Sequence, residues 1–356
     1  MAPLGCPAVT RLALIGLGYW GPNYARVLNE LEQAELVWAC DINEDALELV
    51  KGRYAAVHTT TDLSEVLSDP SVDAVIVSTP TSTHAGVSLA ALSAGKHVLC
   101  EKPLAANTSE CDEVIATAEE KGRIVMVGHT FIFNPAVRRM RELVANETIG
   151  RVLYCHAART ALGPIRKDVN ALWDLASHDV SILLYLLERE PVEVAAHGES
   201  YIRENTEDVV FLSLRFEGSI LANVHVSWLD PYKVRKVTLI GDRRMVVFDD
   251  VSPDEKLRLF DKSASYEAPA VEARGADFGE YKAIVRDGDI LIPKVAATEP
   301  LKEQVRHFLD CCRDGSQPLT DAAFARRVVA VLEAGSESLR QRGGVIDLSW
   351  LESTTA

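Results

Sequence analysis

Residues 11–41 read RLALIGLGYWGPNYARVLNELEQAELVWACD and predict a strand, a glycine-rich turn, a helix and a second strand that ends in an acid. The apolar run Leu12–Ile15 is of the kind that a buried parallel strand needs. Gly16, Gly18 and Gly21 follow at once in the pattern G-x-G-x-x-G. In this context the pattern indicates a dinucleotide-binding turn: the first glycine permits the turn, the second lets a pyrophosphate approach, and the third lets the helix pack on the strand.

Asp41 indicates which cofactor to expect, because it ends the second apolar run, Leu36–Cys40. A carboxylate there can accept hydrogen bonds from both ribose hydroxyls of an adenosine, and it would repel a 2′-phosphate. The pyrophosphate itself would sit on the N–H groups at the start of the helix that follows Gly21. The sequence therefore predicts NAD as the cofactor, in preference to NADP.

Strands and helices alternate through the rest of the N-terminal third. Further buried strands are expected at residues 73–79, 97–103 and 123–129. The alternation predicts an α/β fold with a doubly wound parallel sheet, so residues 1–129 are interpreted as a dinucleotide-binding Rossmann domain. Ligands of such sheets bind at the carboxyl ends of the strands, which places Thr79–Pro80, Glu101–Pro103 and Gly128–His129 at the cofactor edge.

Near residue 130 the pattern changes to consecutive strands. They are expected at residues 152–159, 192–202, 209–216, 219–229, 236–240 and 245–248. Turn signals at Glu217-Gly218 and Gly241-Asp242 predict an antiparallel sheet, with helices on one face. The helices are expected at residues 134–146, 178–190, 301–310 and 322–340. Residues 130–356 are therefore interpreted as a second, α+β domain, in which 250–299 show no regular pattern.

The composition is that of an ordinary globular protein. The chain has 356 residues, 47% hydrophobic and 25% charged, which suffices for two domains with cores of their own. A net charge of −15 argues against nucleic acid or an anionic membrane surface as a partner. No apolar run reaches the ~18 residues of a transmembrane helix, and the N-terminus lacks a signal-peptide pattern. The seven cysteines include no C-x-x-C pair, so we expect a reducing cytoplasm.

Lys102 is the first candidate catalytic residue. It lies at the end of a predicted strand, between Glu101 and Pro103, and so at the edge where the cofactor is expected. An ammonium group there can hydrogen-bond a reacting hydroxyl and stabilise the developing alkoxide. The alternative is an ordinary surface lysine.

Asp174 and His178 are the second candidate, within LWDLASHDVSILLYLL at residues 172–187. If both are helical, their spacing puts them on one face, about one turn apart. Imidazole is a natural general base near neutral pH, and a carboxylate nearby can orient it or hold the substrate. The alternative is that Asp174 or Ser177 caps the helix, and Asp179 is a second possible carboxylate.

Two other chemistries lack their signatures. No pair of histidines or cysteines has a ligand spacing typical of zinc, so no metal is expected. The sequence has no G-x-S-x-G elbow, which argues against Ser/His/Asp hydrolysis.

Several motifs together resemble the Gfo/Idh/MocA family of NAD(P)-dependent sugar and cyclitol oxidoreductases. They are GLGYWGPN at 16–23, STPTSTH at 78–84, EKP at 101–103, GHTFIFNPAVR at 128–138 and WDLASHD at 173–179. EKP followed by D-x-x-x-H is specific to the family, and the resemblance covers nearly the whole chain. It implies that the second domain has an open antiparallel sheet, through which the protein would form a homodimer or homotetramer.

The resemblance also implies roles for individual residues. Lys102, Asp174 and His178 match the family's catalytic lysine, aspartate and histidine, and the Lys102–Pro103 peptide bond is expected to be cis. Cofactor-binding positions are expected at Gly16, Gly18, Tyr19, Trp20, Gly21, Asp41, Ser78, Thr79, Pro80, His84, Glu101 and Lys102. Substrate-binding positions are expected at Asn134, Arg159, Arg166, Asp174 and His178.

Within the family, these motifs and VSWLDPYKVR at 226–235 most resemble UDP-N-acetylglucosamine 3-dehydrogenases and the 3-ketoreductases of deoxysugar pathways. We therefore expect hydride transfer between nicotinamide and C3 of a nucleotide-linked sugar. The expected direction is oxidation, because Asp41 favours NAD and cellular NAD pools favour oxidation. The alternatives are an NAD(P)H-dependent 3-ketoreductase, or a dehydrogenase of a free sugar, a sugar phosphate or inositol. A non-catalytic NAD-binding sensor is the alternative of another class, but it would be expected to lose Lys102 or His178, and this chain has both.

A sugar diphosphate would need a local basic pocket in this acidic protein. Arginine suits phosphate because its guanidinium gives two aligned hydrogen bonds. The candidates are Arg159, Arg166, Lys167, Lys233 and Arg235. For each of them the alternative is a solvated surface charge.

Overall fold

The computed structural model describes residues 9–166, 168–266 and 283–348. The chain divides into two compact units, the first formed by Met1–Asn134 and Thr298–Glu333, the second by Pro135–Ala297 and Ala334–Ala356. Residues 298–333, which we had expected in the second domain, thus belong to the first unit. The reason is the apolar face of helix α8 (Pro300–Asp314), which packs on α1 (Gly21–Glu30) and on the 3-10 turn Thr130–Phe133.

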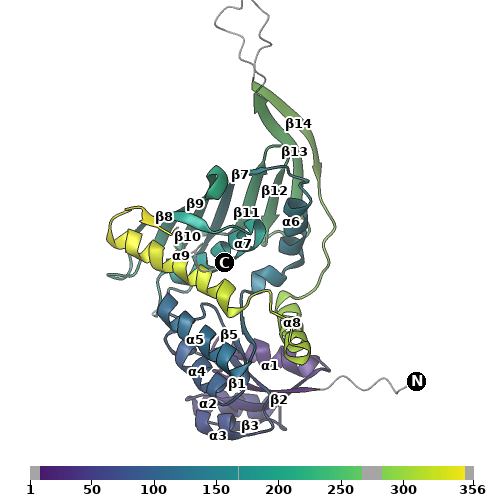
Figure 1. Cartoon of the computed structure of the whole chain (residues 1–356), viewed down its shortest axis with the longest axis vertical. Helices are drawn as coiled ribbons and strands as arrows, with labels where there is room; N and C mark the ends of the chain where they lie inside the picture. Colours follow the sequence, from purple (N-terminus) through teal and green to yellow (C-terminus); the bar gives the residue numbers. More distant parts are fainter. Residues whose placement is uncertain (1–8, 167, 267–282, 349–356) are drawn as a thin grey trace, which may run out of the picture. The chain divides into compact units, whose positions relative to one another are not determined.

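The first unit contains a parallel sheet of six strands in the order β3-β2-β1-β4-β5-β6 (Figure 1). The strands are β1 (Thr10–Ile15), β2 (Ala34–Cys40), β3 (His58–Thr60), β4 (Ala74–Val77), β5 (His97–Cys100) and β6 (Val125–Val127). The helices between them are α1, α2 (Glu44–Arg53), α3 (Leu63–Ser68), α4 (Thr81–Ser93) and α5 (Thr108–Lys121). The strand order reverses between β1 and β4, the place where such sheets bind ligands. The predicted doubly wound parallel sheet is confirmed.

Two short elements of the first unit have no counterpart in the sequence prediction. Strand β3 has three residues and helix α3 has six. Neither is long enough to show the periodicity from which strands and helices are predicted.

The second unit contains a nine-stranded sheet in the order β14-β13-β12-β11-β7-β10-β9-β8-β15. The strands are β7 (Val152–Leu162), β8 (Pro191–Glu199), β9 (Val209–Phe216), β10 (Ile220–Ser227), β11 (Leu229–Gly241), β12 (Met245–Asp249), β13 (Leu257–Tyr266), β14 (Ala283–Leu291) and β15 (Ile346–Asp347). Strands β7 and β10 run parallel, and the other neighbours run antiparallel. The prediction of a mainly antiparallel sheet is confirmed.

Helices cover one face of this sheet. Helices α6 (Pro135–Ala145) and α7 (Ser177–Leu187) pack on each other, and α7 also contacts β7 (Figure 1). Helix α9 (Ala322–Arg340) is shared between the two units, because residues up to Glu333 belong to the first and those from Ala334 to the second. Residues along β9 and β10 alternate between buried and exposed, so that Phe211 and Leu221 are 48% and 45% exposed on the opposite side.

The strands differ from the prediction where proline or charge interrupts the apolar pattern. Strand β11 starts at Leu229, but its pairing with β7 shifts register between Leu229 and Val234, around Pro231. Proline cannot donate to the ladder, which is why the sequence pattern resumed only at residue 236. Strands β13 and β14 pair antiparallel within residues 250–299, where no pattern was predicted. None of the helices in the described residues is long and apolar enough to cross a membrane.

Candidate active site

The glycine turn follows β1 and is pinned to the end of β4. Gly16 has a φ of +92°, and a Cβ on it would lie 2.7 Å from the backbone of Ser78. A Cβ on Gly21 would lie 2.6 Å from the Gly16 carbonyl oxygen, so the helix could not pack as closely. The Ser78 hydroxyl donates to the same carbonyl at 2.6 Å. A Cβ on Gly18, in contrast, would meet nothing within 4 Å, which leaves its backbone open to a ligand.

Asp41 closes the turn from the end of β2. Its Oδ2 accepts a hydrogen bond from Leu17 N–H at 2.5 Å, and its Oδ1 accepts one from Asn43 N–H at 2.8 Å. Each carboxylate oxygen has a second lone pair, and the residue is partly exposed, so it can also accept from ribose hydroxyls.

The surroundings of the turn fit a dinucleotide. Helix α1 has no side-chain cap and no acid in its first turn, so a pyrophosphate would meet no competing carboxylate there. Tyr19 and Trp20 are 86% and 37% exposed and lie edge to face at 5.7 Å between ring centroids. The residues present thus fit NAD, with the glycine turn holding its pyrophosphate and Asp41 its adenosine ribose.

Lys102 follows β5 at the carboxyl edge of the same sheet, and its side chain is only 9% exposed. It is therefore not an ordinary surface lysine. The Lys102–Pro103 peptide bond is cis, as the resemblance implied. Glu101 turns its carboxylate inward, where Oε1 accepts from the Tyr24 hydroxyl at 2.6 Å.

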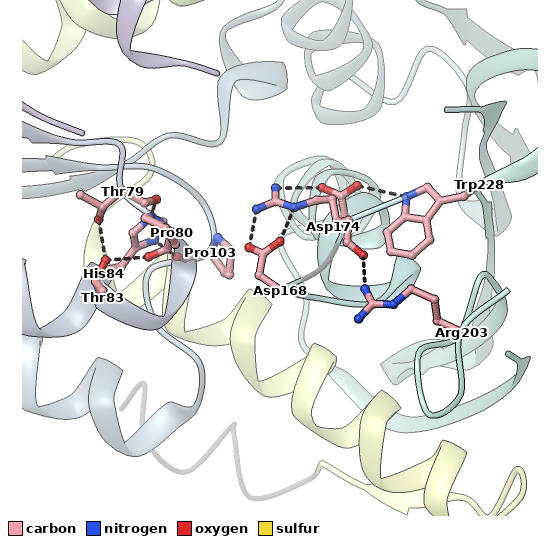
Figure 2. Close-up of polar contacts among 10 residues, drawn as sticks. Thr79, Pro80, Thr83, His84, Pro103, Asp168, Asp174, Arg203 and Trp228 are labelled. Atoms are coloured by element: carbon pink, nitrogen blue, oxygen red, sulfur yellow. Dashed lines mark hydrogen bonds and ion pairs between the residues drawn. The ribbon is translucent and has the colours of Figure 1, made fainter. Parts of the chain in front are cut away.

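His84, which was predicted to bind the cofactor, is held by the backbone at the ends of β4 and β5. It is 1% exposed, with Nδ1 2.7 Å from the Pro103 carbonyl oxygen and Nε2 2.8 Å from that of Thr79 (Figure 2). Both ring nitrogens are thus taken up by the backbone. His84 connects the loops that follow β4 and β5, and it would influence a bound cofactor only through Thr79 and Pro80.

His129, which ends the turn after β6, was placed at the cofactor edge by the sequence. It is 1% exposed, and no hydrogen-bond partner of its two ring nitrogens exists among the described residues. Burial, together with the positive charge of Lys102, lowers the pKa of His129 to about 3. The ring is therefore neutral at physiological pH and adds no charge beside the lysine.

In the second unit, Asp174 and His178 lie on one continuous helical segment. Asp174 belongs to a π-helical turn, Leu172–Ala176, which runs directly into α7. The residue before α7, Ala176, is itself helical and makes no side-chain cap, so the capping role considered for Asp174 or Ser177 is wrong. Single π-turns in helices occur frequently at functional sites.

The Asp174 carboxylate is held from two sides. Arg166 Nη1 donates to its Oδ1 at 3.3 Å, and Trp228 Nε1 donates to its Oδ2 at 3.2 Å (Figure 2). Arg166 is also paired with Asp168 through Nε and Nη2, at 3.0 and 2.6 Å. Its backbone carbonyl accepts from Arg203 at 3.0 Å. Trp228, which the sequence analysis did not single out as a site residue, thereby fixes the orientation of the candidate carboxylate.

The predicted phosphate-binding residues do not form one cluster. Arg159 is 4% exposed and makes a bidentate pair with Asp179, at 3.0 and 2.9 Å, so it is not an accessible phosphate ligand and the prediction for it is wrong. Asp179 is 0% exposed and is equally engaged. Asn134, the remaining substrate candidate, is 6% exposed in the first unit. The remaining basic candidates have different surroundings: Lys233 is exposed, Arg235 lies 3.5 Å from Asp250, and Lys167 is outside the described residues.

A six-stranded parallel sheet with this glycine turn and this acid defines a dinucleotide-binding protein of the Rossmann class. Residues 10–129 match the oxidoreductase family with the NAD-binding Rossmann fold, GFO_IDH_MocA, and residues 137–247 match the GFO/IDH/MocA C-terminal domain. The chain belongs to the Gfo/Idh/MocA family of NAD-binding oxidoreductases.

Three relatives illustrate how far the similarity extends. The 2,7-anhydro-N-acetylneuraminate hydratase of Mediterraneibacter gnavus is 31% identical, over 92% of this chain and 93% of its own length. The UDP-N-acetylglucosamine 3-dehydrogenase of Acidithiobacillus ferrooxidans is 27% identical, over 82% of this chain and 90% of its own. The crystal structure of GenD2 from gentamicin A biosynthesis, in complex with NAD, is 25% identical with a TM-score of 0.81, covering 98% of this chain and 99% of that one.

Proposed function

We propose that the protein oxidises C3 of a nucleotide-linked sugar to a ketone, with NAD as the oxidant. The observation that carries the reaction class is Lys102, a buried lysine at the carboxyl edge of an NAD-binding sheet. The similarity to a UDP-N-acetylglucosamine 3-dehydrogenase over 82% of the chain supports the substrate class.

The roles of the residues follow from their chemistry. When bound, NAD supplies the hydride acceptor at its nicotinamide ring. Lys102 would hydrogen-bond the reacting hydroxyl and stabilise negative charge on its oxygen. His178, which is partly exposed, would accept the hydroxyl proton, and Asp174 would hold a sugar hydroxyl or orient the imidazole.

A second candidate, the oxidation of a free sugar or polyol, is favoured by one observation. Two of the basic residues predicted to receive a diphosphate are already engaged, since Arg159 is buried in an ion pair and Arg166 is paired with two carboxylates. A substrate without phosphate would not require them.

A substrate screen distinguishes the candidates. NADH production should appear with one of the UDP-, dTDP- or GDP-sugars and be about 10²–10⁴ times slower with Lys102→Ala, and NMR should locate the new ketone at C3. Turnover of free glucose, glucose 6-phosphate or myo-inositol alone would overturn the nucleotide-sugar proposal. One relative is a hydratase, so addition of water to the substrate must also be tested. Hydration is redox-neutral, so it would produce no net NADH, and mass spectrometry would detect the added water.

We also propose that the protein is a homodimer or homotetramer that associates through the exposed side of the nine-stranded sheet. Tyr154, Phe211 and Leu221 place large apolar side chains there, at 49%, 48% and 45% exposure. Replacing Phe211 and Leu221 by lysine should reduce the mass measured by light scattering to that of a monomer. An unchanged mass would rule out this surface.

A further inference from the structure

A chain of hydrogen bonds, partly buried at Thr130 and buried from Gln304 onward, runs through the first unit to the residue before Lys102. The Thr130 hydroxyl donates to Gln304 Oε1 at 2.7 Å, and Gln304 Nε2 donates to the Tyr24 hydroxyl oxygen at 3.0 Å. The Tyr24 hydroxyl in turn donates to Glu101 Oε1 at 2.6 Å. The second oxygen of Glu101 accepts from the backbone N–H of Lys102 at 3.1 Å. The chain thus connects α8 and α1 with the end of β5.

All the donors in this chain point toward Glu101. An ionised carboxylate can only accept, so the Tyr24 hydroxyl must donate to it and keeps its lone pair for the Gln304 amide. The oxygen of that amide then accepts the hydrogen bond of the Thr130 hydroxyl. Hydrogen bonds aligned in one direction polarise one another, and a charged acceptor at the end strengthens them further.

Burial makes the charge state of Glu101 depend on these partners. Tyr24 and Gln304 are 0% exposed and Glu101 is 7% exposed. Burial raises the pKa of Glu101, while the Tyr24 hydrogen bond, the charge of Lys102 and the charge of His84 on α4 each lower it, in that order of size. Burial and the adjacent carboxylate likewise raise the pKa of Tyr24, so it remains a donor.

Space also restricts the carboxylate. A Cβ on Gly128 would lie 3.2 Å from Glu101 Oε1 and 3.3 Å from Oε2, so the carboxylate fills the volume above this glycine. The Glu101 carboxylate thus lies between the Tyr24 hydroxyl of α1 on one side and Gly128, which follows β6, on the other.

We propose that Tyr24 and Gln304 are positioning residues for Lys102: they hold Glu101 as an oriented carboxylate, which fixes the Lys102 backbone and stabilises its ammonium group. This inference rests on the proposed function, in which Lys102 acts on the reacting hydroxyl. It goes beyond it by assigning a role to two side chains that have no expected contact with substrate or cofactor.

The test compares three single variants. Tyr24→Phe deletes the hydroxyl and keeps the ring, Gln304→Met deletes one link further from Glu101, and Tyr54→Phe is the matched control. Tyr54 is a partly exposed tyrosine at the end of α2 in the same unit. Effects should decrease in that order, and Tyr54→Phe should behave as the wild type.

The first readout needs no substrate. Tyr24→Phe should raise the pKa of Glu101 in the folded protein further. A carboxyl whose pKa is raised by folding destabilises the folded protein as the pH rises above the unfolded-state pKa of about 4.3, because the unfolded chain ionises first. The melting temperature of Tyr24→Phe should therefore match the wild type more closely at acid pH and fall behind it as the pH approaches neutrality. A difference that does not change with pH would show a merely structural hydroxyl and overturn the inference.

The second readout is turnover of the sugar found in the screen. Because the oriented carboxylate is needed, kcat of Tyr24→Phe should fall below that of the wild type most strongly on the acidic side of the pH profile, where a Glu101 with a further raised pKa is protonated first. The Kd for NAD should stay within about twofold of the wild type. Unchanged pH profiles in both Tyr24→Phe and Gln304→Met would overturn the inference, and Gln304→Met alone decides if Tyr24→Phe does not fold. Turnover retained in Lys102→Ala would instead refute the proposed role of Lys102, which separates the two failures.

Discussion

Replacing Asp41 by asparagine tests whether one carboxylate both shapes the glycine turn and selects NAD. In the structure its two oxygens accept from the backbone N–H groups of Leu17 and Asn43, at 2.5 and 2.8 Å. An asparagine amide has only one acceptor oxygen, so one of these N–H groups would face an NH2 group. The ribose hydroxyls of NAD would lose a charged acceptor by the same substitution.

The magnitude follows from these bonds. A hydrogen bond to a charged group contributes about 1.5–3 kcal/mol, and the partial exposure of Asp41 reduces this, because water replaces part of what is lost. We expect the first unit to be destabilised by about 1–2 kcal/mol. Each kcal/mol should lower the melting temperature by about 2–4 °C. Losing a similar contact to the ribose should weaken NAD binding by about 10–100-fold.

The effect can be measured by titrating the protein with NAD and with NADP. Binding is followed by tryptophan fluorescence, because Trp20 lies in the glycine turn and is 37% exposed. The wild type should prefer NAD, and Asp41→Asn should lose most of this preference, because the charge that repels the 2′-phosphate is gone. Asp45→Asn removes an exposed charge from the nearby first turn of α2 and serves as the control. Tighter binding of NADP by the wild type, or unchanged NAD affinity and melting temperature in Asp41→Asn, would refute the reasoning.

Three further substitutions test the other site residues. Lys102→Ala should lower kcat by about 10²–10⁴ with little change in NAD binding; steady-state kinetics with near-normal turnover would remove the lysine from the mechanism. In the wild type the rate should rise with pH as the His178 imidazole loses its proton, and His178→Asn should remove the imidazole's part of this rise; an unchanged profile would mean that another group is the base. Arg159→Leu leaves Asp179 charged and buried and should cost about 3–5 kcal/mol in urea unfolding, whereas a loss below about 1 kcal/mol would show that the pair contributes little.

The parts of the fold that are local in sequence could be predicted. The glycine turn, its flanking strands and Asp41 lie within residues 11–41, and each glycine meets the neighbour that its predicted role requires. The spacing of Asp174 and His178 similarly predicted one helical segment, although a π-turn at Asp174 could not be foreseen from apolar periodicity.

The parts that depend on distant partners could not be predicted. Arg159 and Asp179 are 20 residues apart, and nothing in the sequence around either distinguishes a buried pair from two surface charges. Gln304 and Tyr24 are 280 residues apart, on helices whose own patterns show only an apolar face. Which polar side chain points inward is decided by tertiary packing, and propensity and periodicity carry no information about it.

Residues 298–333 belong to the first unit although they follow the second in sequence, and this affects how the protein folds during its synthesis. A ribosome emits the chain from its N-terminus, and domains generally fold in the order of their synthesis. Here the parallel sheet and α1 emerge first, but α8, which packs on α1 and buries Leu301, Val305 and Phe308, comes almost at the end. The nascent nucleotide-binding half must therefore keep an apolar surface exposed while the whole intervening sheet is translated. A fragment ending at residue 129 would carry that surface permanently and would lack Gln304, so the cofactor-binding half is best produced from the full chain.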